Sequence, residues 1–166
     1  MKVTGFFFEC AFAGANAGKR GMRMTSQEIA IYREIQKNTE NAMKAIDTIS
    51  DKVYDEALSM QLSRQSIKYS ELHNAASKRL VDGKADYFRS TPLADAMLRT
   101  GIHYNTLLNT STSHIAEVLI KGCTSGILEM EKALKRNADA GEQPITMAKQ
   151  LIETQERHVA RLKQYL

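Results

Sequence analysis

The sequence predicts an all-α protein built as an antiparallel, up-and-down bundle of four main helices. After Met24, apolar residues recur every three or four positions over most of the chain, as expected where one face of each helix packs against its neighbours. No stretch of useful length alternates apolar and polar residues in the manner of a strand. With 166 residues, 43% of them hydrophobic, the chain can form one domain with a sizeable core.

The first predicted helix starts after Thr25, because Thr25 and Glu28 have the spacing of a capping box. Apolar residues then follow at helical spacing over roughly 25 residues, and Ser50 and Asp51 offer the break and the cap of the next helix. The apolar stripe consists of Ile29, Tyr32, Ile35, Met43, Ile46 and Ile49.

The second predicted helix ends at Gly83, a residue suited to the left-handed conformation that often follows a helix. The residues from Asp82 to Thr91 form a polar linker, longer than the other connections. The stripe of this helix consists of Leu58, Leu62, Tyr69, Leu72, Ala76 and Leu80.

An extra helical segment is predicted between the second and third main helices. Thr91 supplies a hydroxyl cap and Pro92 fits the first turn. Apolar residues recur at helical spacing from Leu93 onward. If they belonged to a single helix, that helix would have about 45 residues and would be far longer than its neighbours. We therefore expect a break within Asn109–Ser113, which is rich in capping residues, and an extra helix over Leu93–Leu108.

The third main helix is expected to carry Gly122 and Gly126 on its inner face, where they would let a neighbouring helix approach closely. The segment Gly141–Pro144 forms the last turn. The final helix carries an apolar stripe made of Ile145, Ala148, Ile152, Val159, Leu162 and Leu166.

Residues 1–24 form a leader that differs in composition from the bundle at 25–166. Four of the five Phe and four of the nine Gly precede Met24. Three interpretations remain open: a start assigned too early, with translation beginning at Met22 or Met24; an arm of the protein; or a weak signal peptide ending after Ala17. The first interpretation, which we favour, places the protein in the cytoplasm, whereas a signal peptide over residues 1–17 would export it.

The charge distribution excludes two classes of partner. Four basic residues and one acidic residue precede Met24, so most of the net charge of +4 belongs to the leader. A nearly neutral bundle predicts no nucleic-acid partner and no basic membrane-binding face. No run of eighteen apolar residues predicts a membrane span. Because the extra helix needs a partner, we expect a homo-oligomer; any other protein partner is unknown.

The run Ser111–Gly122 (STSHIAEVLIKG), followed by Gly126 and Ile127, resembles a group of ferritin-like proteins of anaerobic gut-type bacteria whose function is unknown. The resemblance covers residues 25–166 and implies a ferritin-like bundle with a crossover between its second and third helices. Di-iron members of that superfamily place Glu on two helices and Glu-x-x-His on the other two, all facing inward.

The carboxylates of that motif are missing here. Ser70 stands three residues before His73, and Gln155 stands three residues before His158. A hydroxyl and an amide are poor substitutes for carboxylate oxygens as metal ligands. We therefore expect no cofactor, no catalytic residue and a structural or protein-interaction role.

An alternative function is iron or zinc binding, for storage or against oxidative stress. His114 and Glu117 share one side of a helix at a spacing of three, and His73 or His158 could complete a non-standard site. The competing interpretation of His114 and Glu117 is a surface pair at a helix start.

Polar residues lie on or beside the inner faces of the predicted helices. We expect them to form a layer that fixes the register of the helices and has no catalytic role. These residues are Thr39, Gln65, Ser111 and Gln155. Cys123, in an apolar stripe, is expected to be a buried structural thiol.

Overall fold

The computed structural model describes residues 24–107 and 109–166. The predictions for the leader before Met24, and those for the side chains of Tyr104 and Leu108, lie outside the described residues. The described chain forms five α-helices and a short 3-10 turn, with no strand among these residues. The helices are α1 (Ser26–Ser50), α2 (Glu56–Asp82), α3 (Pro92–Leu107), α4 (Thr112–Arg136) and α5 (Glu142–Leu162), and the turn is η1 (Lys163–Tyr165).

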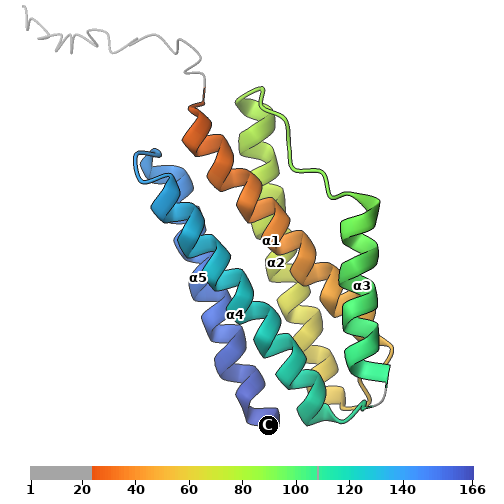
Figure 1. Cartoon of the computed structure of the whole chain (residues 1–166). Coiled ribbons are helices and arrows are strands. Elements are labelled where there is room, and N and C mark those ends of the chain that lie inside the picture. The colour runs from red at the N-terminus through yellow and green to blue at the C-terminus, as the bar shows by residue number, and fades with distance from the viewer. Residues whose placement is uncertain (1–23, 108) are drawn as a thin grey trace, which may run out of the picture.

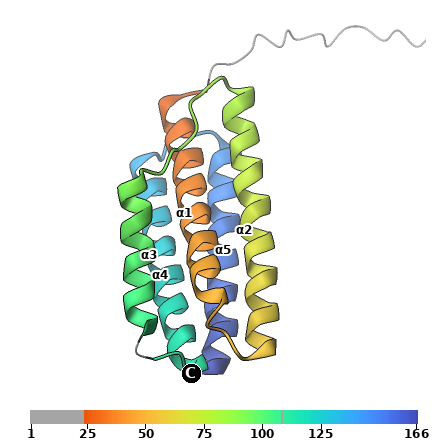
Figure 2. The same cartoon turned by 90° about the vertical axis from the view of Figure 1, so that its right-hand side faces the viewer.

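The five helices lie side by side along one direction, and the chain reverses at each connection (Figure 1). Helices α1, α2, α4 and α5 pack around a common core, while α3 lies outside them against α1 and α4 (Figure 2). As a result α2 and α4 run in the same direction, and the connection between them, which contains α3, crosses the length of the bundle. An all-α bundle is thereby confirmed.

Helix α1 begins where the capping box predicted. The Thr25 hydroxyl accepts a hydrogen bond from the Glu28 N–H at 3.2 Å, and the Glu28 carboxylate accepts one from the Thr25 N–H at 2.8 Å. These two bonds satisfy backbone donors that a helix start leaves without intrahelical partners. The prediction for the next cap was wrong, because Asp51 ends α1 and Asp55 caps α2 through the Leu58 N–H at 2.7 Å.

Gly83 follows α2, as predicted, but it does not adopt the left-handed conformation. Its φ is −81°, whereas Lys84 has a φ of 53°. The N–H of Ala85 bonds to the Leu80 carbonyl at 2.9 Å, which closes the helix end around Lys84. A Cβ at Gly83 would lie 2.6 Å from Cγ of Met24, so the Met24 side chain would have to move to admit it.

The break before α4 lies within the predicted segment. Thr91 accepts a hydrogen bond from the Ala94 N–H at 3.2 Å at the start of α3, and Ser111 caps α4 through the His114 N–H at 3.3 Å. Ser111 is therefore an exposed cap rather than a member of an interior layer, which corrects that prediction.

Helix α3 packs against other helices of the same chain, chiefly α1 and also α4. Ile102 is buried and Leu98 is half-buried against the core. Lys44 of α1 binds the Asp95 carboxylate at 2.6 Å, and Lys52 donates to the Thr106 hydroxyl at 2.7 Å.

The buried face of α5 is rotated from the predicted stripe. Leu151 and His158 are buried, Ile152 and Val159 are half-buried, and Leu166 is 63% exposed. The buried side chains of this helix also include polar ones, which apolar periodicity does not register. Among the residues that the structure describes, no helix combines the length and the hydropathy needed to cross a bilayer.

Candidate functional site

A polar layer crosses the centre of the bundle, with Tyr69 of α2 in its middle. The Tyr69 side chain is 1% exposed, and its hydroxyl lies 2.9 Å from Nδ1 of His158 on α5 and 3.6 Å from Sγ of Cys123 on α4. The tyrosine and histidine rings meet edge to face, with centroids 5.0 Å apart. Three helices are thus joined through one hydroxyl.

These three groups are all neutral near pH 7. Burial, followed by the positive charges of Arg161 and Arg157, lowers the pKa of His158 to about 4. Burial also raises the pKa of the Tyr69 hydroxyl and that of the Cys123 thiol above their ordinary values. The hydroxyl can donate to the unprotonated Nδ1 and accept from the thiol, so the chain of contacts holds no activated nucleophile.

A second set of contacts, next to the first, joins α1, α4 and α5. The Asn38 Nδ2 donates to the Gly126 carbonyl at 2.7 Å, and the Gln155 Nε2 donates to the Asn38 Oδ1 at 2.8 Å. A Cβ at Gly126 would lie 2.8 Å from Asn38 Oδ1 and closer still to Gln155 Nε2. The expected close approach at Gly126 is confirmed, but Gly122 is exposed and a Cβ there would meet no atom within 4 Å.

Thr39 and Gln65 are buried, as is Gln155, so these three predicted members of the layer do lie inside. The Thr39 hydroxyl donates to the Ile35 carbonyl at 2.7 Å and lies 3.2 Å from Nδ1 of His73.

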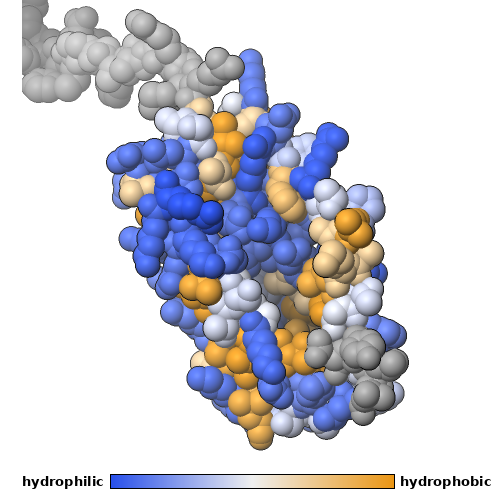
Figure 3. Space-filling view, in the orientation of Figure 1, coloured by the Kyte–Doolittle hydropathy of each residue, from blue (hydrophilic) through white to orange (hydrophobic). Residues whose placement is uncertain are grey.

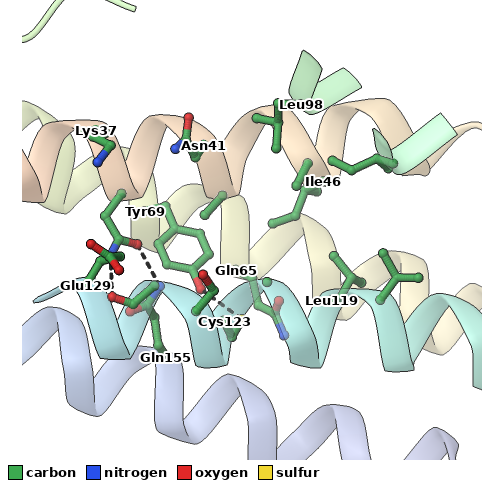
Figure 4. Close-up of a pocket in the computed structure, with 18 of the residues that line it drawn as sticks. Lys37, Asn41, Ile46, Gln65, Tyr69, Leu98, Leu119, Cys123, Glu129 and Gln155 are labelled. Carbon is green, nitrogen blue, oxygen red and sulfur yellow. Dashed lines mark hydrogen bonds between the residues drawn. The ribbon is translucent and has the colours of Figure 1, made fainter. Parts of the chain in front are cut away.

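A pocket of about 230 Å³ opens beside this layer, between α1 and α4 and next to α3. Figure 3 shows apolar side chains along α3 and around a hollow beside it. Figure 4 shows Gln65, Tyr69, Cys123 and Gln155 grouped in the pocket. Lys37 and Glu129, which are far more exposed, also line it. The walls between are largely apolar: Ala42, Ala45, Ile46, Leu98, Ile102, Val118 and Leu119.

Two buried amide atoms in this pocket have no hydrogen-bond partner in the structure: Nε2 of Gln65 and Oε1 of Gln155. Gln65 is 2% exposed and Gln155 is 1% exposed. A buried polar atom without a partner costs about 1–3 kcal/mol. The pocket is the candidate site, because it combines a cavity with apolar walls and lies next to the buried polar layer.

The candidate metal ligands do not converge. His114 and Glu117 lie together, with Nδ1 and Oε2 3.7 Å apart, but Lys121 also binds Glu117 at 2.7 Å and lowers its pKa. His158 is buried against Tyr69, while His73 lies at the α1–α2 contact. Across residues 24–107 and 109–166, no group of three or more His, Cys, Asp or Glu side chains could hold a metal ion.

Sequence reasoning missed Asn38 and the pocket. Asn38 is 7% exposed and follows Ile31 and Ile35 at helical spacing on the buried face of α1. Because its side chain is polar, the apolar stripe does not include it; its amide donates to the facing Gly126 carbonyl. A scan of protein-family models, a search of curated proteins and a search of solved structures each give no match for this chain, so the roles assigned to these residues rest on geometry.

Proposed function

We propose that this chain is a non-catalytic, ferritin-like helical bundle that acts as a structural or protein-interaction unit and assembles with copies of itself. The observation that carries the proposal is the polar layer. At the centre of the bundle, where di-iron proteins place carboxylates, stand neutral groups hydrogen-bonded to one another: Asn38, Tyr69, Cys123, Gln155 and His158. Such a layer favours one register of the helices.

The direction of the helices supports the ferritin-like assignment. The connection containing α3 crosses the bundle, so that α2 and α4 run in parallel. This is the arrangement of a bundle with one long crossover.

Metal content tests the non-metal part of the proposal. The full chain, produced in medium supplemented with iron and zinc, is expected to contain well below one metal ion per chain by plasma mass spectrometry. The His114→Ala variant serves as the matched control and is expected to give the same low value. Near-stoichiometric metal in the parent that is lost in His114→Ala would instead establish the iron- or zinc-binding alternative.

Self-association is expected to depend on the outer face of α3, where Leu93 is 72% exposed and Met97 is 68% exposed. These two residues are one helical turn apart and form an apolar patch. Light scattering should give a multiple of the 18.6 kDa chain mass for the parent. The double variant Leu93→Glu with Met97→Glu should be monomeric.

Ile67 of α2 provides the control for that experiment, because it is apolar and 61% exposed but lies on another helix. Ile67→Glu should keep the parent's mass. A monomeric parent chain would remove self-association from the proposal and leave the neutral bundle in place.

A further inference from the structure

We propose that α3 is a lid, which detaches from the bundle as a unit while the other four helices stay folded, and which thereby opens the pocket to solvent. The inference goes beyond the proposed function, because self-association concerns only the outer face of α3. It starts from the position of α3 outside a core that α1, α2, α4 and α5 already form by packing against one another (Figure 2).

Among the helices as the structure describes them, α3 buries the fewest side chains. Of its described side chains only Ile102 and Thr106 are buried, whereas each of the other four helices buries at least six. Elements with few buried contacts open at a lower free energy than the core of a protein. Helix α3 is therefore the helix that can detach with the smallest loss of packing.

The contact between α3 and the bundle also contains the pocket. Leu98 and Ile102 of α3 form part of its wall, so about 230 Å³ between this helix and the rest of the bundle is not filled by side chains. Side chains that line a void lose contacts there, which weakens the docking of α3. Detachment of α3 removes this wall. It exposes the pocket side of Cys123 on α4, which is 9% exposed in the closed structure (Figure 4).

The connections of α3 allow such a movement. Before the helix, Arg33 donates to the Asp86 carbonyl at 2.7 Å, and the Gln36 Oε1 accepts from the Phe88 N–H at 2.8 Å. These bonds hold the linker on α1 as far as Phe88, so the three residues between Phe88 and α3 form the hinge. On the other side of α3, residues 109–111 are exposed.

Two lysines of α1 hold the two ends of the lid. Lys44 binds the Asp95 carboxylate at 2.6 Å near the start of α3, and Lys52 donates to the Thr106 hydroxyl at 2.7 Å near its end. The side chains of Lys44 and Asp95 both keep contact with solvent. An ion pair of this kind contributes little free energy, so it acts as a latch that can break and re-form.

Native-state hydrogen exchange of the full chain, followed for each amide by NMR, tests whether α3 opens by itself. Amides of α3 should exchange at least about 100-fold faster than those in the centre of α1 and α4. Leu151→Ala, on α5, deletes buried contacts that stay intact while the lid opens. It should speed the exchange of core amides at least about 30-fold and leave that of α3 unchanged. Ile31→Val, a smaller deletion in the core worth about 2–10-fold, replaces it if Leu151→Ala does not fold.

The latch is tested by Asp95→Asn, which removes the charge that Lys44 binds. The exchange of α3 amides should become up to about fivefold faster. Glu71→Gln is the matched control, because Glu71 forms an exposed ion pair with Lys68 on α2, at 2.7 Å. It should leave the exchange of α3 unchanged.

Labelling of the Cys123 thiol with Ellman's reagent tests whether the lid opens the pocket. The measurement is made with Cys10→Ser, which leaves Cys123 as the only cysteine of the chain. Asp95→Asn should raise the labelling rate by the same factor as the exchange of α3. Leu151→Ala should leave the labelling rate unchanged.

Two results would overturn the proposal. If Leu151→Ala speeds α3 and the core amides equally, α3 opens only when the whole bundle unfolds. If the labelling of Cys123 follows the core amides instead of α3, detachment of α3 does not open the pocket. The double variant Leu93→Glu with Met97→Glu changes only the outer face of α3 and should keep the exchange pattern of the parent, so the lid and self-association can fail independently.

Discussion

Replacing Gly126 by alanine is expected to lower the free energy of unfolding by about 2 kcal/mol, although alanine is the better helix former. The added methyl group would lie 2.8 Å from Asn38 Oδ1 and closer to Gln155 Nε2. Both amides are buried and bonded to each other, so neither can move aside without breaking a hydrogen bond. Either α4 must move away from α1 and α5, or the hydrogen bond between Asn38 and Gln155 must break.

Gly122, one turn earlier on α4, is the control for this substitution. A Cβ there meets no atom within 4 Å, and the residue is exposed. Gly122→Ala should therefore stabilise the protein by up to about 1 kcal/mol through helix propensity alone. Urea denaturation followed by the helical circular dichroism signal measures both changes. Equal effects of the same sign would show that α4 and α5 are not in close contact at Gly126.

The second large effect is a loss of stability on acidification, caused by His158. Its folded-state pKa is about 4, against an ordinary value of 6.5. Between these values the unfolded chain binds a proton that the folded chain excludes, so acid favours unfolding. The contribution of His158 is complete above pH 6.5 and is lost as the pH falls toward 4. Between pH 7 and 5 the loss should be roughly 2 kcal/mol.

His158→Gln tests this assignment, because glutamine can still bond to the Tyr69 hydroxyl but does not titrate. The free energy of unfolding of this variant should change little between pH 7 and 5, whatever its absolute value. If His158→Gln and the parent lose stability in parallel, another group is responsible for the acid sensitivity.

The sequence predicted the helix starts whose capping residues lie next to one another in the chain. Thr25 with Glu28, and Thr91 with Pro92, place cap and first turn within four residues, and the structure confirms both starts. Asp51 and Asp55 carry the same side chain, so local chemistry does not decide between them. Asp55 becomes the cap of α2 because of where α2 packs against α1. The sequence around residue 51 carries no information about that packing.

The interior was harder to predict because an apolar stripe leaves out polar residues, even where they stand at the same helical spacing. Gln65 and Gln155 stood out since they lie on or beside apolar stripes, and they are buried. Asn38 also stands at this spacing, three residues after Ile35, but the carbonyl that satisfies its amide belongs to Gly126, 88 residues away. The pocket depends in the same way on how α3 settles against α1 and α4, a property of three helices together.

Five helices that each traverse the bundle have a consequence for whatever the chain is attached to. An odd number of passes leaves Met24 at one pole and Leu166 at the opposite pole (Figure 1). Helix α1 alone, with 25 residues, spans roughly 37 Å. A segment attached directly at Met24 would therefore lie about one helix length from a segment attached at Leu166.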